Sequence, residues 1–201
     1  MPSSKLPIIL ASGSASRKQL LDNLQIKYTC HKPGINEQAL SHESHPNLAL
    51  RLAKEKALHS ANTLNQPGLY IGSDQVASLT TETGTIQLEK PYTQERAIQQ
   101  LEACQGQTVT FYTSLCLYNS HTKNTQLDLA TYTVKFRQLS RTQLKRYVEI
   151  DQPLQCAGSF KMESLGISLF ESMHGSDPNS LVGLPLIMLC NFLINEDAYP
   201  L

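Results

Sequence analysis

Hydrophobic positions along the chain form two kinds of pattern, short apolar runs typical of buried strands and spacings typical of helices, and the two kinds alternate. Residues 8–10 form a short apolar run and residues 69–79 form a longer one, each with the length of a buried strand. Between them, residues 46–61 place small and apolar side chains at helical spacing, and Pro46 opens this helix. Strand-like and helix-like patterns that alternate in this way predict an α/β fold rather than an all-helical one.

The second half of the chain predicts an antiparallel hairpin. Residues 109–118 and 127–139 are rich in strand-forming side chains, and a polar turn joins them. Polar and apolar residues alternate over residues 131–136, as in a sheet with one covered face. Ser140 and Gln143 form a capping box that predicts a helix after the hairpin.

Shorter patterns predict how other elements begin and end. The polar residues 72–75 interrupt the second apolar run, so we expect that strand to break there. Residues 81–85 predict a hairpin turn, and residues 93–104 predict a helix. Residues 156–170 predict a small-residue turn followed by a strand, and a short apolar helix follows near the end of the sequence.

The junction between the first strand and the first helix has the character of a phosphate-binding loop. Residues 11–16 carry no side chain larger than a hydroxymethyl group, so backbone can approach a ligand closely. A helix that starts there offers free N–H groups and the positive end of its dipole. Ser12 and Ser14 add hydroxyl donors, and Arg17 adds a forked cation. The glycine-rich phosphate motifs are absent from this stretch, so an ordinary strand, turn and helix is the alternative.

Three charged side chains occupy positions that call for an explanation. Asp74 interrupts an apolar run, and a buried carboxylate is costly unless it is paired, so Asp74 ends the strand or is functional. Lys56 falls on the small, inward stripe of its helix, where it is a buried cation or snorkels to the edge. Lys90 lies between a strand and a helix, where loops bind ligands, or is an ordinary surface lysine.

Composition limits the classes of function. The 201 residues suffice for one domain or for two lobes with a soft boundary near residue 105. Lys plus Arg and Asp plus Glu both number 17, and this balance disfavours a broad nucleic-acid interface. Five widely spaced cysteines and a first segment without the length of a signal peptide predict a cytoplasmic protein with no membrane association.

The motifs together resemble the Maf family of nucleotide pyrophosphatases over nearly the whole chain. The matching segments are LASGSASR, the acid Glu37, RLAKEKA, GSDQV, EKP, AGSF and NSLVGLPL. Within the family, GSDQV with AGSFKMES resembles the branch that hydrolyses 7-methyl-GTP. Two positions depart from the pattern: Glu89 replaces the glycine before Lys90, and Ser16 stands where that branch carries an aromatic residue.

The resemblance implies a fold and an assembly. The fold is a central mixed twisted sheet flanked by helices, with two lobes around a substrate cleft, as in Maf and ITPase-like proteins. Residues 1–201 then form a single Maf-type catalytic domain. Ser12, Asp74 and the loop around Ala157 form the floor of the cleft. The resemblance also implies a homodimer.

The resemblance further implies the roles of the site residues. Asp74 accepts a proton from the attacking water, and Mg²⁺ or Mn²⁺ binds to carboxylate oxygens and bridges the phosphates. Glu163 stands where other branches place a glutamine, and its charge suits the cationic 7-methylguanine; the alternative is a solvated acid at a strand edge. The implied site comprises Asp74, Lys56 and Lys90 as catalytic residues, Glu37 and Asp74 as metal ligands, and Ser12, Ser14, Ser16, Arg17, Gln75 and Glu163 as substrate-binding residues.

Three other functions remain open from the sequence. The same cations suit a nucleotide-binding regulator, related to cell division, that has little catalysis. A Maf pyrophosphatase that prefers dTTP or UTP is a second alternative. A cysteine hydrolase with Cys156 as nucleophile and His174 as base is the third, because Cys156 lies beside a glycine-containing turn.

Overall fold

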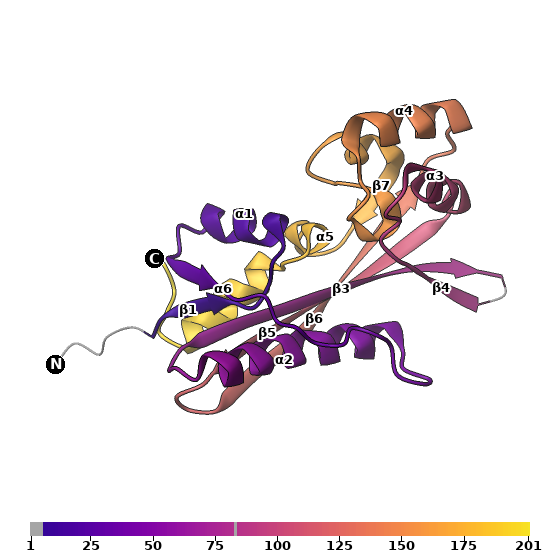
Figure 1. Ribbon diagram of the computed structural model, residues 1–201. Coiled ribbons are helices and arrows are strands. Elements are labelled where there is room, and N and C mark those ends of the chain that lie inside the picture. The colour runs from indigo at the N-terminus through magenta and orange to yellow at the C-terminus, as the bar shows by residue number, and fades with distance from the viewer. Residues whose placement is uncertain (1–5, 83) are drawn as a thin grey trace.

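The computed structural model describes residues 6–82 and 84–201. In these residues one seven-stranded mixed sheet has the order β2-β1-β3-β5-β6-β7, with β4 beside β3 (Figure 1). β1 is parallel to β2 and β3, whereas the pairs β3–β4, β3–β5, β5–β6 and β6–β7 are antiparallel. The strands are β1 (Ile8–Leu10), β2 (Tyr28–Cys30), β3 (Leu69–Thr81), β4 (Gly84–Leu88), β5 (Thr108–Asn119), β6 (Asn124–Phe136) and β7 (Phe170–His174). The predicted mixed α/β fold is confirmed.

Helices cover both faces of this sheet (Figure 1). α2 lies along one face of the long strands, α1, α5 and α6 lie on the opposite side, and α3 and α4 form a second group with β7 at the far end of the sheet. The helices are α1 (Ala15–Asn23), α2 (His45–Leu64), α3 (Gln94–Ala103), α4 (Arg141–Asp151), α5 (Asn179–Val182) and α6 (Leu186–Asn195), with two 3₁₀ turns, η1 (Ala157–Ser159) and η2 (Leu165–Leu169).

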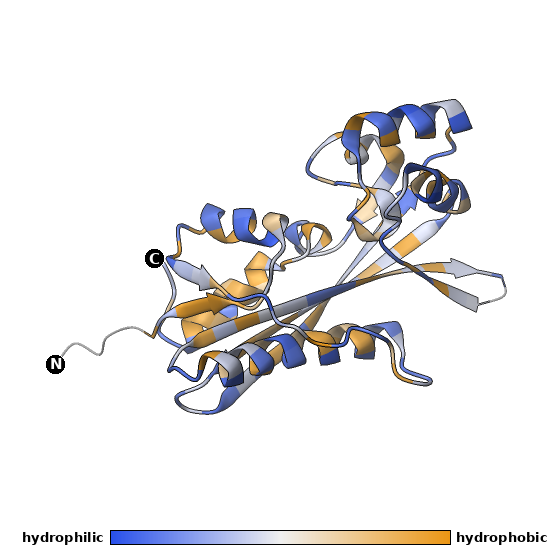
Figure 2. Ribbon diagram, in the orientation of Figure 1, coloured by the Kyte–Doolittle hydropathy of each residue, from blue (hydrophilic) through white to orange (hydrophobic). Residues whose placement is uncertain are grey.

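Side chains of β3 alternate between the two helical layers, as the period of a strand requires. Leu69 and Ile71 pack with α1 and α6, while Tyr70 packs with the alanines of α2. The apolar stripe of α2 is confirmed, because its alanines at 49, 53 and 57 are fully buried. Figure 2 shows the apolar colour concentrated on β1 and α6, and a hydrophilic segment in the middle of β3.

The expected break in the strand at residues 72–75 is wrong, because β3 runs through them without interruption. Gly72 explains part of this: a Cβ there would lie 2.1 Å from the carbonyl oxygen of Ala53, so only glycine lets α2 approach so closely. The carboxylate of Asp74 stays in the strand because α2 supplies Lys56 as its partner. The prediction was wrong because it considered only the polarity of residues 72–75. The ion pair with Lys56 of α2 allows Asp74 to lie within a continuous strand.

The expected strand within residues 156–170 is largely wrong as well. The segment folds into η1, a turn and η2, and the strand begins only at Phe170. Within η1, Gly158 has a φ of 78° and Ser159 a φ of 61°, so the backbone is not extended there. Phe160 and Phe170 then meet edge to face with ring centroids 4.8 Å apart, and this contact draws both ends of the segment into one core.

Several boundaries agree with the sequence. The hairpin of β3 and β4 pairs Thr81 with Gly84, although Thr83 lies outside the described residues. The capping box of Ser140 and Gln143 opens α4, and Thr93 caps α3.

The single domain over residues 1–201 with a soft boundary near residue 105 stays a prediction. In the part of the chain that the structure describes, no helix combines the length and apolar character needed to cross a bilayer.

Candidate active site

The candidate site lies beside a gap in the pairing of β3. Along one edge of β3, β1 pairs with Leu69–Ile71 and β4 pairs with Ala77–Thr81, while β5 occupies the other edge from Leu69 to Leu79. Residues 72–76 thus lie between the ends of two strands. Both β1 and β4 point their carboxyl ends at this gap, since β1 is parallel to β3 and β4 is antiparallel. The loops after these strands carry Ser12 and Lys90, so the topology brings two predicted site segments together.

The loop after β1 has the form expected of an anion-binding loop. Ser14 is the N-cap of α1, and its hydroxyl accepts the backbone N–H of Arg17 at 3.4 Å. The Ser12 hydroxyl is 6% exposed and accepts the N–H of Ser14 at 3.1 Å and an Nη1–H of Arg17 at 3.3 Å. Ser16 lies in the first turn of α1 and is partly exposed. Anions bind in proteins at loops of this kind, where a helix begins and a guanidinium lies near its first turn.

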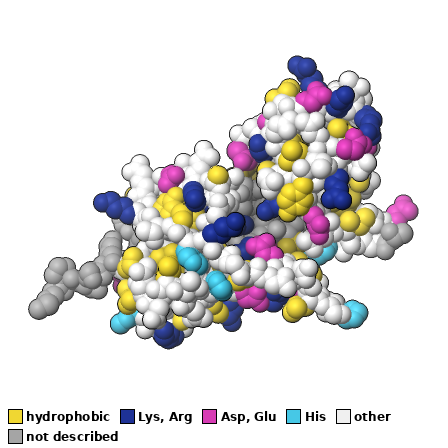
Figure 3. Space-filling view, in the orientation of Figure 1, with side chains coloured by type: hydrophobic (Ala, Val, Ile, Leu, Met, Phe, Trp, Pro, Cys, Tyr) yellow, Lys and Arg dark blue, Asp and Glu magenta, His cyan; other side chains and the backbone are white. Residues whose placement is uncertain are grey.

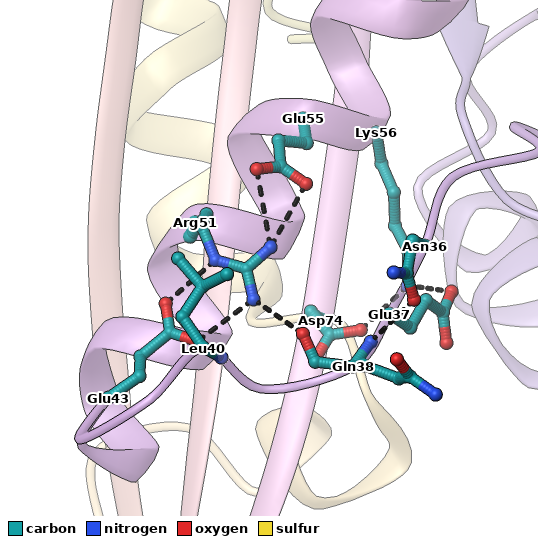
Figure 4. Close-up of polar contacts among 9 residues, drawn as sticks. All are labelled: Asn36, Glu37, Gln38, Leu40, Glu43, Arg51, Glu55, Lys56 and Asp74. Atoms are coloured by element: carbon teal, nitrogen blue, oxygen red, sulfur yellow. Dashed lines mark hydrogen bonds and ion pairs between the residues drawn. The ribbon is translucent and has the colours of Figure 1, made fainter.

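The ammonium of Lys56 lies between two carboxylates (Figure 4). Its Nζ is 2.6 Å from Oδ1 of Asp74 on β3 and 2.7 Å from Oε1 of Glu37. The Lys56 and Asp74 side chains are 8% and 11% exposed, whereas Glu37 is 56% exposed. Lys56 is therefore a buried, paired cation, and the alternative of a lysine that snorkels to the helix edge is excluded. Asp74 lies in the middle of the strand, which excludes the interpretation that it ends it.

The charges of Arg17 and Glu37 affect each other's pKa, so the two side chains belong to one group of interacting charges. Burial lowers the pKa of Arg17, and the charges of Asp74 and Glu37 oppose this effect. Partial burial raises the pKa of Glu37, but the hydrogen bond and charge of Lys56, with Lys90 and Arg17, outweigh it and leave that pKa below its ordinary value. Figure 3 shows basic and acidic side chains gathered in the hollow between the two groups of helices.

Lys90 lies in the loop after β4, and Glu163 belongs to the segment between η1 and η2. Both side chains are exposed. Lys90 influences the pKa of Glu37 and also that of Cys156, and Glu163 influences Cys156 as well. Glu163 occurs in the turn between η1 and η2 rather than at a strand edge. Lys90 and Glu163 both act electrostatically on Cys156, and their contact with a nucleotide stays a prediction.

Gln75 occupies a different environment from its neighbour Asp74, because successive side chains of a strand point to opposite faces. Its Nε2 donates to the hydroxyl of Thr113 at 3.0 Å and to the carbonyls of Ser180 and Leu181 at 2.7 and 3.2 Å. The amide nitrogen thus holds α5 against the sheet. Its role in substrate choice stays a prediction.

The role of Gly183 was missed in the sequence. Its carbonyl oxygen accepts Nε–H of Arg17 at 2.7 Å and the hydroxyl of Ser73 at 2.9 Å, and so links α1, β3 and the C-terminal segment. Its φ is 109°, and a Cβ there would meet Nε of Arg17 at 3.4 Å, so glycine suits both the backbone and the contact. The signal was available, since Gly183 belongs to the segment NSLVGLPL.

Comparison with known proteins shows the family to which the chain belongs. Residues 7–196 match the family model described as Maf-like protein. The chain belongs to the Maf family. Maf proteins named 7-methyl-GTP pyrophosphatase are similar to it over nearly their full length: that of Pseudomonas putida is 50% identical, covering 95% of this chain and 97% of the relative. That of Vibrio cholerae is 47% identical, covering 94% and 95%, and that of Idiomarina loihiensis is 44% identical, covering 98% of each.

A solved structure shares the fold of this Maf protein. The Staphylococcus aureus Ham1 protein superposes with a TM-score of 0.55 at 12% identity, covering 94% of this chain and 99% of that chain. At this identity the likeness concerns the fold alone. It agrees with the expected ITPase-like arrangement of a mixed sheet flanked by helices.

Proposed function

We propose that this Maf protein hydrolyses 7-methyl-GTP to 7-methyl-GMP and diphosphate, which removes a modified nucleotide from the pool. The observation that carries the proposal is the ammonium of Lys56 held between the carboxylates of Asp74 and Glu37. The names of relatives at 44–50% identity, 7-methyl-GTP pyrophosphatase, support this substrate.

In the proposed reaction a water oxygen forms a bond to the α-phosphorus, and the bond from that phosphorus to the α–β bridging oxygen breaks. Asp74 accepts the proton of the attacking water, while Lys56 holds the carboxylate of Asp74 in one position. Arg17 and Lys90 offset the charge that moves to the leaving diphosphate, and Ser12 and Ser14 donate to phosphate oxygens together with the loop N–H groups. These residues supply orientation and charge neutralisation, which are the main needs of this chemistry.

The residues present fit a divalent metal that binds together with the nucleotide. Mg²⁺ is typically held by one or two carboxylates, waters and substrate phosphates, and Glu37 and Asp74 offer two such carboxylates around one cation. Among residues 6–82 and 84–201, no group of three or more His, Cys, Asp and Glu side chains could hold a metal without substrate. Mg²⁺ or Mn²⁺ held by Glu37 and Asp74 would neutralise phosphate charge when bound.

We propose that Glu163 recognises the base, and substitution by glutamine tests this. Methylation at N7 gives the purine a positive charge, and N1–H and the exocyclic amine form two donors that a carboxylate accepts. A charge-assisted hydrogen bond of this kind contributes roughly 1.5–3 kcal/mol, so Glu163→Gln should lower the preference for 7-methyl-GTP over GTP about 10- to 100-fold. Ratios of kcat/KM for the two nucleotides measure the effect.

Glu171→Gln is the matched control for this substitution, because Glu171 is an exposed glutamate on β7. We expect it to leave the ratio unchanged. An unaltered ratio in Glu163→Gln as well would contradict base recognition by Glu163. Ser16 offers no aromatic surface to the base, so Glu163 carries a larger share of the selectivity than in a protein with a stacking partner there.

A nucleotide panel distinguishes the proposal from its alternatives. Release of diphosphate from 7-methyl-GTP, GTP, dTTP and UTP with Mg²⁺ or Mn²⁺ should be fastest for 7-methyl-GTP. Preference for dTTP or UTP would instead support the other Maf activity, and binding without hydrolysis would support a nucleotide-binding regulator.

The cysteine hydrolase is disfavoured, because burial raises the pKa of the Cys156 thiol and the charge of Glu163 raises it further. Thiol alkylation should leave turnover unchanged.

We also propose a cytoplasmic homodimer that binds a small nucleotide and no nucleic acid. The balanced charge of the chain supports the last point. Sedimentation of the purified protein measures the oligomeric state.

A further inference from the structure

Glu37 is a site residue on a segment without regular structure. Residues 31–44 join β2 to α2 and contain neither helix nor strand. The Glu37 side chain is 56% exposed, and its ion pair is with Lys56. An exposed residue on such a segment has many accessible positions, so its carboxylate needs an anchor before it can meet Lys56 in one place. The hydrogen bonds of α2 identify that anchor.

Arg51 of α2 holds the segment with two nitrogens of its guanidinium, Nε and Nη2 (Figure 4). Nε and Nη2 donate to the two carboxylate oxygens of Glu43 at 2.7 and 2.8 Å. Nη2 also donates to the backbone carbonyl of Gln38 at 3.0 Å, and Nη1 binds Glu55 at 3.1 Å. We call Arg51, Glu43, Glu55 and the Gln38 carbonyl the Arg51 clamp.

The clamp is stronger than an ordinary surface ion pair. Its contact with Glu43 is bidentate, and the Arg51 and Glu43 side chains are 21% and 9% exposed. One oxygen of Glu43 accepts the N–H of Leu40 at 3.0 Å as well, so the clamp holds the segment at two points. The hydrogen bond from Arg51 lowers the pKa of Glu43 to about 2, which keeps this carboxylate ionised at neutral pH.

The geometry of the helix converts this anchor into a position for Glu37. Arg51 and Lys56 are five residues apart, which corresponds to about 7.5 Å along the helix axis and about 140° around it. Arg51 therefore holds the carbonyl of Gln38 from the outer side, while Lys56 meets the carboxylate of Glu37 from the inner side. Because Glu37 and Gln38 are adjacent, a displacement of the carbonyl displaces the carboxylate.

We propose that Arg51 is a positioning residue for the reaction: it holds Gln38 and Glu43 and thereby places the Glu37 carboxylate at Lys56 and the phosphates. This inference rests on the proposed function, in which Glu37 acts at the phosphates, and adds to it a residue that touches neither substrate nor reacting atoms. Its consequence is that loss of Arg51 damages activity only through Glu37.

A double-mutant cycle tests this consequence. Arg51→Ala should lower kcat/KM for 7-methyl-GTP about 10- to 100-fold, which is the usual effect of misplacing a site group. In the Glu37→Gln background, Arg51→Ala should add less than about a twofold loss, because the group it positions is already missing. Equal losses in both backgrounds would overturn the proposal, since Arg51 would then act by another route.

Conservative and control variants separate positioning from general stability. Glu43→Gln should reproduce most of the loss, and Arg51→Lys should fall between wild type and Arg51→Ala because lysine keeps the charge without the fork. Arg141→Ala is the matched control: Arg141 also binds two glutamates, Glu95 and Glu102, but on α3 and α4. It should retain wild-type activity. A loss in Arg141→Ala equal to that in Arg51→Ala would contradict a specific role for Arg51.

Hydrogen exchange provides a measurement that needs no nucleotide. In the free protein, Arg51→Ala should speed amide exchange in residues 36–41, while Arg141→Ala leaves these residues unchanged. Unchanged exchange in Arg51→Ala would overturn the inference even where the protein hydrolyses 7-methyl-GTP. If the wild type hydrolyses no nucleotide, the proposed function fails, and faster exchange in Arg51→Ala still supports Arg51 as the residue that positions Glu37.

Discussion

Asp74→Asn should lower kcat for 7-methyl-GTP about 10²- to 10⁴-fold, the usual loss when a general base is removed. Asparagine keeps the shape of the side chain but accepts no proton from water. Binding should change little, because Lys56 retains its ion pair with Glu37 at 2.7 Å and the amide oxygen still accepts a hydrogen bond. Turnover and calorimetric titration with an α,β-methylene analogue of 7-methyl-GTP measure the two quantities separately.

Asp128→Asn is the matched control, because Asp128 is an exposed aspartate on the sheet, in β6. It should behave as the wild type in both measurements. Near-wild-type turnover in Asp74→Asn would refute the mechanism, because no proton would then need to reach this carboxylate. An equal loss of binding and turnover would instead assign Asp74 to ground-state binding.

Lys56→Met should damage stability and activity together. The substitution leaves Asp74, whose side chain is 11% exposed, without its cation, and removing one partner of a buried ion pair costs about 3 kcal/mol of the free energy of unfolding. In the proposed reaction it also removes a positive charge from beside the phosphates, so kcat/KM should fall about 10²-fold or more. Urea unfolding and steady-state kinetics measure the two effects.

The double variant Lys56→Met with Asp74→Asn separates the two causes. It should recover part of the stability lost in Lys56→Met, because no unpaired charge remains buried, while activity stays absent. Lys145→Met is the control for stability: Lys145 pairs with Glu149 at 3.9 Å on the surface of α4, so the change should be under about 0.5 kcal/mol. Full stability of Lys56→Met would contradict the buried pair.

The spacing of hydrophobic residues along the sequence predicted most of the strands and helices, because this spacing is a local property. The alternation over residues 131–136 and the stripe of alanines on α2 each report which side chains are buried, because burial follows the period of a strand or a helix. The serine-rich loop before α1 was predicted for a similar reason, since small side chains and a cap are local properties. The resemblance to Maf proteins then supplied the proposed site residues, which no hydrophobic period indicates.

Glu163 and Gln75 mark the limit of that resemblance. The sequence names both as substrate-binding residues, and the structure shows that Gln75 donates its amide to Thr113 and to α5. Glu163 and Lys90 both act electrostatically on Cys156. The partners of a side chain depend on which elements pack together. The surroundings of Gln75 and Glu163 were therefore not predictable from the spacing of residues along the sequence.

The sequence by itself determined most of the strands and helices and the serine-rich loop before α1, because each depends on residues within a few positions of one another. Only the tertiary structure decided that β3 continues through Asp74, since the cation that pays for this burial comes from α2, eighteen residues away. The pairing of β1 and β4 with the two ends of β3 decided where the site lies. The Arg51 clamp decided where Glu37 lies. Such contacts join segments that local patterns treat as independent, so they become visible only when the chain is folded.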